Sequence, residues 1–184
     1  MSSRIFTVPN QLTFLRLVFL PFFIIAIEYD RYGAALAILV VSGVTDSLDG
    51  WLARGLDQKT ALGAYLDPIA DKLMLSSSYF VLAYKAKIGW WLAILVLSRD
   101  VLLLTAAAVI LITVGYRPFP PSIWGKTTTF FEILLIVIVL VLAVTGREEL
   151  AIAKEMCGFL VAAFVLISGV HYSIVVSRRL QAGH

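Results

Sequence analysis

Charged residues are scarce in this chain. Its 184 residues include 15 basic and 12 acidic side chains, which make up 15% of the total, whereas hydrophobic residues make up 60%. Soluble domains contain about 25% charged and 45–50% apolar residues. This scarcity excludes a disordered chain and most cytosolic enzymes, and the net charge of +3 is too small for a nucleic-acid-binding face. The mean hydropathy of +0.93 instead predicts one integral membrane domain over residues 1–184.

Cysteine is almost absent. Cys157, the single cysteine, excludes an internal disulfide and lies in an apolar run, which favours a buried structural thiol. Internal repeats, low-complexity tracts and long polar linkers are also missing, so nothing divides the chain into domains.

Long hydrophobic runs are abundant. A helix needs about 20 apolar residues to span a bilayer, and six stretches meet that length. We therefore predict an all-α integral membrane protein with six transmembrane helices, which cover residues 9–28, 33–53, 61–84, 88–114, 122–145 and 150–176.

An even number of spans places both termini on one side of the membrane. Seven basic residues fall on that side and five on the other, a bias that favours cytoplasmic termini. The seven are Arg4, Arg54, Lys59, Arg117, Lys126, Arg178 and Arg179, and the five are Arg31, Lys85, Lys87, Arg147 and Lys154. The tryptophans lie near the predicted span ends, where indole rings form interfacial belts; they are Trp51, Trp90, Trp91 and Trp124.

Four aspartates lie where the second span ends and the third begins. A mid-helix aspartate costs about 2.5–3.5 kcal/mol on membrane insertion scales, so a compensating cation is needed. Asp46 and Asp49 are about 60° apart around one helix, and Asp67 and Asp71 are about 40° apart around the next. Two neighbouring helices therefore place four carboxylates toward one cavity.

Oxygen ligands without nearby histidine or cysteine indicate hard cations, and four carboxylates suit a pair of Mg²⁺ or Mn²⁺ ions. Gly50, Ala53 and Gly63 keep the same faces small, which permits close approach of a bulky ligand or of another helix. Arg54 and Thr60, between the acidic helices, are suited to hold phosphate oxygens. The alternative is that the four acids form ion pairs at the membrane surface and bind no metal.

The spacing of these residues resembles the signature of the CDP-alcohol phosphotransferases. The matching pattern is Asp46-x2-Asp49-Gly50-x2-Ala53-Arg54-x8-Gly63-x3-Asp67-x3-Asp71. The resemblance implies a six-helix, usually homodimeric membrane enzyme, with two divalent ions that grip the diphosphate of a CDP-linked lipid. Position by position, it implies that Asp46 and Asp67 bridge both ions, that Asp49 and Asp71 each complete one site, and that Asp71 is the proton acceptor.

The resemblance also implies contacts to the CDP-lipid. Gly50, Arg54 and Thr60 match its cytidine diphosphate contacts, with Ala53 and Gly63 on the same faces. The segment Pro9-Asn10-x2-Thr13 resembles the part of the first helix that closes over the nucleotide, so Asn10 and Thr13 join this set. The implied reaction moves a phosphatidyl group from CDP-diacylglycerol to an alcohol and releases CMP. We expect a bacterial inner (plasma) membrane enzyme whose active site faces the cytoplasm.

The acceptor is decided by other positions. The segments Val8-Pro9-Asn10 and Leu66-Asp67-Pro68 look like the branch of phosphatidylglycerophosphate synthases and CDP-dependent cardiolipin synthases. Glycerophosphate enzymes commonly carry a second arginine in the fourth span and Gly-Lys-x-Lys-Thr in the fifth. Here residues 102–111 contain no base, and Thr128 replaces the second lysine. Fewer cations suit a singly charged phosphodiester, which favours phosphatidylglycerol as acceptor, with glycerol 3-phosphate as the alternative.

Two basic residues are candidates for binding the acceptor's phosphate. They are Arg99 and Lys126, because a mid-span arginine is expensive unless it is paired or functional. The alternative is pairing with Asp100 or Glu132. Glu132 itself stays open as an acceptor contact, and His171 as an interfacial residue or a catalytic one.

Two other classes of protein compete with a phosphatidyltransferase. A divalent-cation transporter has acids distributed along a path through the bilayer, whereas here they cluster at one end. A non-catalytic lipid-binding scaffold tolerates Asp71→Asn.

Overall fold

The described part of the chain folds into six α-helices. A computed structural model describes the backbone of residues 8–56, 61–113 and 123–181, and the side chains of residues 15, 17–45, 72–105 and 123–172. The helices are α1 (Val8–Glu28), α2 (Tyr32–Leu56), α3 (Ala61–Tyr84), α4 (Trp90–Thr113), α5 (Ile123–Thr145) and α6 (Glu149–Gln181). All six correspond to predicted stretches, and the described ranges contain no strand. The all-α prediction is therefore confirmed for this part of the chain.

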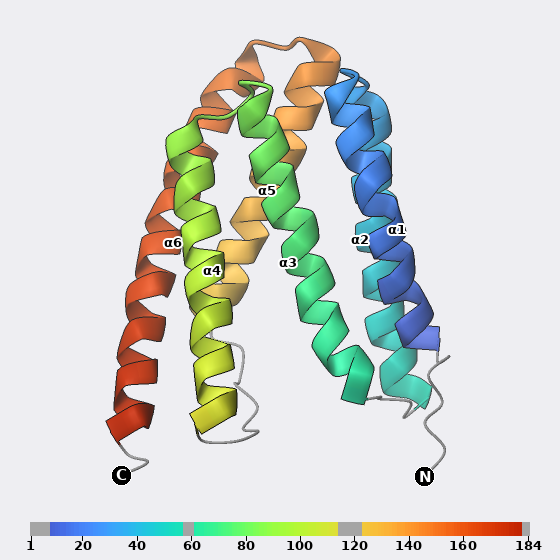
Figure 1. The fold of residues 1–184 in the computed structure, drawn as a ribbon. Coiled ribbons are helices and arrows are strands. Elements are labelled where there is room, and N and C mark those ends of the chain that lie inside the picture. Colours follow the sequence, from blue (N-terminus) through green and yellow to red (C-terminus); the bar gives the residue numbers. More distant parts are fainter. Residues whose placement is uncertain (1–7, 57–60, 114–122, 182–184) are drawn as a thin grey trace.

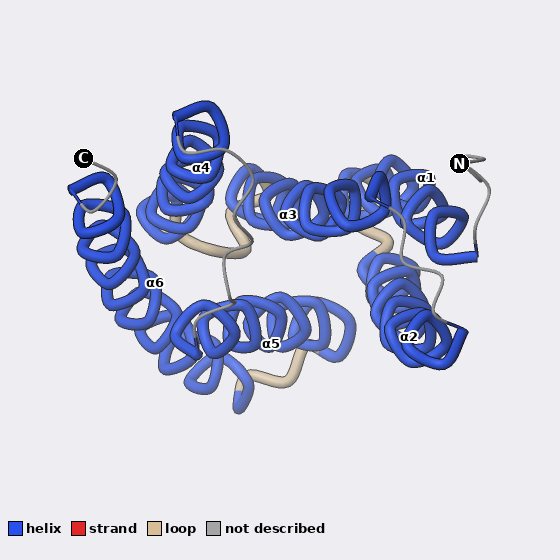
Figure 2. The backbone as a smooth tube through the Cα atoms, turned by 90° about the horizontal axis from the view of Figure 1, so that it is seen from below, coloured by secondary structure: helices blue, strands red, loops and turns tan. Residues whose placement is uncertain are grey.

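The helices alternate in direction and form a ring. Seen along the bundle, the order around the ring is α1, α2, α5, α6, α4 and α3, and α3 also touches α5 across it (Figure 2). The chain termini lie at one end of the bundle, where the helices diverge (Figure 1). The sequence predicts that the acidic helices α2 and α3 are direct neighbours. In the described chain, however, both pack against α1 and not against each other.

At the opposite end, two helices finish in the same capping motif. Asp30 and Ala86 follow α1 and α3 with φ angles of 57° and 53°. The Arg31 amide donates to the Ala26 carbonyl at 2.7 Å, and the Lys87 amide donates to the Leu82 carbonyl at 2.8 Å. These bonds across a left-handed residue satisfy carbonyls that each helix end leaves unpaired. Tight turns therefore fix how α1 enters α2 and how α3 enters α4.

The described surface is apolar where it would face lipid. Phe23 and Ile27 are fully buried inside the bundle, whereas Phe22, Ile94 and Phe159 are 57%, 59% and 65% exposed. Large exposed patches of this kind mark contact with lipid or with another protein. Cys157 is buried and unpaired, as predicted.

Two helices are long and apolar enough to cross a membrane within the described residues. They are Ile123–Thr145 and Glu149–Tyr172, and Leu17–Glu28 and Tyr32–Thr45 are shorter apolar helical segments. The prediction of six spans therefore has direct support for α5 and α6, and it stays a prediction for the other four helices.

Candidate active site

The four predicted metal ligands lie on helix segments at one end of the bundle. Asp46 and Asp49 fall in the last three turns of α2, and Asp67 and Asp71 in the first three turns of α3. Both segments belong to the end that carries the chain termini (Figure 1). Because each helix is continuous there, each pair shares one helix face. Their side chains lie outside the described residues.

The end of α2 and the start of α3 cannot be far apart. Only residues 57–60 separate Leu56 from Ala61, and a chain of that length spans at most about 18 Å. Asn10 and Thr13 lie in the first two turns of α1, at the same end of the bundle. The predicted nucleotide-closing segment and the acidic segments are therefore brought to one end.

The predicted CDP contacts follow the same helices. Gly50, Ala53 and Arg54 lie on α2 and Gly63 lies on α3, although their side-chain surroundings are outside the described set. Thr60 falls in a segment that the structure does not describe. These contacts stay predictions.

The metal prediction depends on the four aspartates. Among the described side chains, no group of three or more histidine, cysteine, aspartate or glutamate residues is placed to hold a metal ion. The four aspartates fit a hard divalent cation by their chemistry, because carboxylate oxygens are the ligands that Mg²⁺ and Mn²⁺ prefer. Two carboxylates per helix, on helix ends joined by four residues, supply enough ligands for two ions.

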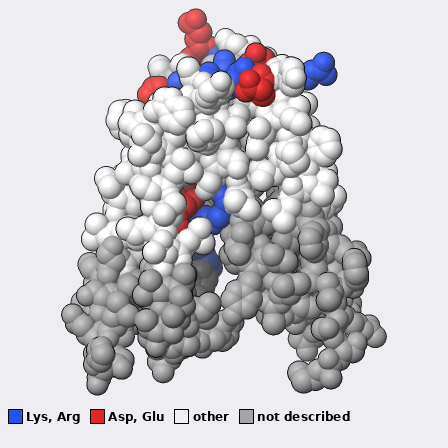
Figure 3. All heavy atoms as spheres, in the orientation of Figure 1, with Lys and Arg blue, Asp and Glu red and all other residues white. Residues whose placement is uncertain are grey.

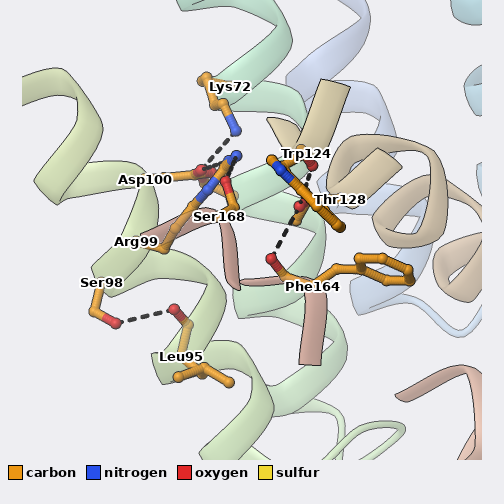
Figure 4. Close-up of polar contacts among 10 residues, drawn as sticks. Lys72, Leu95, Ser98, Arg99, Asp100, Trp124, Thr128, Phe164 and Ser168 are labelled. Carbon is orange, nitrogen blue, oxygen red and sulfur yellow. Dashed lines mark hydrogen bonds and ion pairs between the residues drawn. The ribbon is translucent and has the colours of Figure 1, made fainter. Parts of the chain in front are cut away.

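A buried polar cluster begins one residue beyond Asp71. Lys72 Nζ on α3 donates to Asp100 Oδ1 on α4 at 2.5 Å, and Ser76 Oγ donates to Asp100 Oδ2 at 3.3 Å. Arg99 Nη1 donates to the same Asp100 Oδ1 at 2.8 Å, and Arg99 Nη2 donates to Ser168 Oγ on α6 at 3.1 Å. The labelled side chains of this cluster converge between the helices in Figure 4.

Arg99 is therefore a buried, paired arginine. Its exposure is 6%, and that of Asp100 is 2%. Pairing with Asp100 is one of the two alternatives that the sequence left open for Arg99, and it occupies Nη1. Among the described residues, Arg99 Nε has no hydrogen-bond partner, so the guanidinium keeps a free N–H donor at this atom. Lys126 lies in the first turn of α5 with an exposed side chain.

Glu132 and Thr128 face the interior from α5. Glu132 is fully buried, and both of its carboxyl oxygens lack a hydrogen-bond partner among the residues that the structure describes. The Thr128 hydroxyl lies 2.7 Å from the Trp124 carbonyl and 3.2 Å from the Phe164 carbonyl of α6. Thr128, where a lysine is expected in the glycerophosphate enzymes, is thus a contact between helices.

Sequence reasoning missed the roles of Lys72 and Ser168. Their partners lie 28 and 69 positions away, beyond any helical spacing. In the space-filling view, charged atoms on this face occur at the end formed by the short turns and inside an opening at mid-height (Figure 3). Part of the charged interior is therefore visible from this face.

Comparison with known proteins gives the chain a family context. Residues 6–174 match the family model described as CDP-alcohol phosphatidyltransferase. A protein of Mycobacterium tuberculosis named as a putative cardiolipin synthase is 37% identical over 130 residues, which cover 70% of this chain and 62% of that protein. The chain thus spans less than two thirds of the length of that relative.

Two further relatives align over nearly the whole chain. A probable phosphatidylglycerophosphate synthase of Mycobacterium tuberculosis is 33% identical and covers 97% of this chain and 84% of its own length. A CMP-forming cardiolipin synthase of Streptomyces coelicolor is also 33% identical, over 98% of this chain and 87% of its own length. Their names differ in the acceptor, so similarity to these three does not choose between acceptors.

Proposed function

This chain belongs to the CDP-alcohol phosphatidyltransferase family, and from that membership we propose that it transfers a phosphatidyl group from CDP-diacylglycerol to an alcohol and releases CMP. The observation that carries the proposal is the set of four aspartates at the adjoining ends of α2 and α3, inside the segment that matches the family. A scaffold or a transporter has no comparable need for this signature.

The proposed roles of the aspartates follow from their chemistry. Asp46 and Asp67 would each contribute to both of two Mg²⁺ or Mn²⁺ sites, and Asp49 and Asp71 would each contribute to one. When bound, these ions supply positive charge that neutralises the diphosphate and the departing CMP. Asp71 also takes the proton of the acceptor hydroxyl, which becomes acidic as its oxygen bonds to phosphorus.

The CDP-lipid binds beside the same aspartates. Gly50, Ala53 and Gly63 leave room on α2 and α3 for the nucleotide, while Arg54 and Thr60 hold phosphate oxygens. The start of α1, with Asn10 and Thr13, closes over the cytidine. These helix segments all belong to one end of the bundle, which supports a single nucleotide site.

Phosphatidylglycerol is the proposed acceptor, which makes the protein a cardiolipin synthase. Lys72, Arg99 and Asp100 together carry one net positive charge, because Asp100 offsets one of the two bases. One positive charge, with Lys126 on α5 as a further base, suits a phosphodiester better than a doubly charged phosphomonoester. The buried Thr128 supports the same choice, since a lysine at that position would add a further cation. Glycerol 3-phosphate is the alternative acceptor, because one of the relatives carries a phosphatidylglycerophosphate synthase name.

We place the enzyme in the bacterial inner membrane as a homodimer with six spans. Residues 1–184 form one domain, and the active site and both termini face the cytoplasm, which is where the basic residues are more numerous. The apolar exposed surface of α4 and α6, with residues such as Trp91 and Phe159, supports contact with lipid or a second copy.

The metal requirement tests this function. Purified protein with CDP-diacylglycerol and phosphatidylglycerol should release CMP only when Mg²⁺ or Mn²⁺ is present, and a chelator should abolish the release reversibly. CMP release that continues in excess chelator, after metal-free purification, would contradict the proposed site.

A further inference from the structure

Glu132 is an unexplained buried acid near the centre of the bundle. It is fully buried on α5, and in the described part of the chain neither carboxyl oxygen has a hydrogen-bond partner. The Tyr79 hydroxyl donates at 3.2 Å to the backbone carbonyl of Glu132, not to its carboxyl group. A buried carboxyl without donors is strongly disfavoured unless something else supplies them. Glu132 therefore has two acceptor atoms available to a ligand.

The hydrogen bonds described for the neighbouring bases go to residues other than Glu132. Lys72 Nζ donates to Asp100, and both terminal nitrogens of Arg99 donate to Asp100 and Ser168. The charges of Lys72, Asp100 and Arg99 nevertheless act on the Glu132 carboxyl group, so the four residues form one electrostatic unit. Within this unit, the buried side-chain atoms that have no hydrogen-bond partner among the described residues are the two Glu132 oxygens and Arg99 Nε.

These free atoms have complementary chemistry. Arg99 Nε offers one positively charged donor, which suits a phosphate oxygen, and Glu132 offers acceptors, which suit hydroxyl groups. We propose that Glu132 binds a hydroxyl group of the acceptor that does not react, and so makes the site selective for polyol phosphate esters. This inference rests on the proposed phosphatidyltransferase function and adds a specificity residue to it.

A pair of acceptors isolates that hydroxyl group. Phosphatidylglycerol and phosphatidyl-1,3-propanediol share the phosphodiester and the reacting primary hydroxyl, and differ in the secondary hydroxyl. Glycerol 3-phosphate and 3-hydroxypropyl phosphate form the same pair for the alternative acceptor. The wild-type enzyme should prefer the glycerol compound by about tenfold in kcat/KM, the effect expected of one buried hydrogen bond.

Substitution of Glu132 tests the assignment directly. Glu132→Leu should remove the preference, because both carboxyl oxygens are lost, while KM for CDP-diacylglycerol stays unchanged. Glu132→Gln keeps the size and polarity of the side chain and should reduce the preference at least threefold. This variant replaces Glu132→Leu in the test if the leucine variant does not fold. Ser78→Ala is the matched control, because Ser78 is fully buried on α3 and its hydroxyl donates to the Met74 carbonyl of its own helix. This control should keep the full preference.

The outcomes separate the two proposals. A wild-type enzyme that turns over both members of a pair equally well overturns the role of Glu132, whatever the variants do. A Glu132 variant that keeps the wild-type preference overturns it as well. Absence of CMP release with every acceptor overturns the proposed function, and the Glu132 assignment with it.

Discussion

Lys72 Nζ donates to Asp100 Oδ1 at 2.5 Å, which joins α3 to α4 one residue beyond the proposed proton acceptor Asp71. Asp100 also accepts from Arg99 and Ser76, so its two oxygens serve three donors. A buried carboxylate with this many charged partners fixes the register between two helices. The proposed catalytic segment of α3 is thereby anchored to the rest of the bundle.

Asp100→Asn should destabilise the protein strongly. The change leaves Lys72 and Arg99 without their counter-charge in a buried site, and breaking a buried pair costs about 3–5 kcal/mol. Thermal unfolding in detergent, followed by tryptophan fluorescence, should show a clear drop in Tm. Ser98→Ala on the same helix is the control, since Ser98 is exposed and its hydroxyl donates to the Leu95 carbonyl of its own helix. Equal Tm values for the two variants would show that the cluster does not anchor α3.

Asp71→Asn should lower kcat by about 10²–10⁴-fold, because the variant cannot accept the proton of the acceptor hydroxyl. Binding of CDP-diacylglycerol should fall much less, since three aspartates remain. Single-turnover CMP release and equilibrium binding of the nucleotide lipid measure the two effects separately. Unimpaired turnover would refute the role given to Asp71 as the proton acceptor.

The turn between α1 and α2 should show an alkaline transition. The Tyr32 hydroxyl donates to Asp30, and burial together with that bond raises the pKa of Tyr32 to about 12, above its ordinary value of about 10. A raised pKa means that this contribution to stability is complete below pH 10 and is lost as the pH rises to about 12. Ultraviolet titration should therefore detect a late-ionising phenol that Tyr32→Phe removes. Tyr29→Phe, which removes a phenol that is 74% exposed, should leave the late component in place.

The stability that Asp30 contributes should depend on pH in the opposite sense. The pKa of the Asp30 carboxyl group lies below its ordinary value. The hydrogen bond from Tyr32 is the largest cause, and the hydrogen bond from Lys85 is the next largest. The stability from these bonds is therefore present above about pH 4 and is lost as the pH falls through the lowered pKa. Asp30→Asn should make unfolding in acid less dependent on pH, and an unchanged acid profile would contradict this.

The helices were predictable from sequence because lipid leaves the backbone little choice. Long apolar runs in a bilayer must satisfy their hydrogen bonds internally, so polar turns such as Tyr84–Gly89 mark the helix ends. Helix order around the ring was not predictable in the same way. Which helices touch depends on side-chain fit between distant segments, and α1 lies against both acidic helices for a reason that spacing along the chain does not reveal.

The aspartates were identifiable from sequence because their spacing is local. Pairs at i, i+3 and i, i+4 share a helix face whatever the tertiary structure. The polar cluster was harder to predict. The sequence left both Asp100 and Glu132 open as partners of Arg99, and in the structure Arg99 pairs with Asp100. A partner such as Ser168, 69 residues away, requires knowledge of how α4 packs against α6.

The most direct test of the central claim is an assay of purified protein with CDP-diacylglycerol and Mg²⁺, offered phosphatidylglycerol, glycerol 3-phosphate, inositol phosphate or serine in parallel. CMP release and lipid products are measured together. We predict CMP release with phosphatidylglycerol and the formation of cardiolipin. Turnover with glycerol 3-phosphate alone would contradict the proposed acceptor, and no CMP release with any of the four would contradict the assignment as a phosphatidyltransferase.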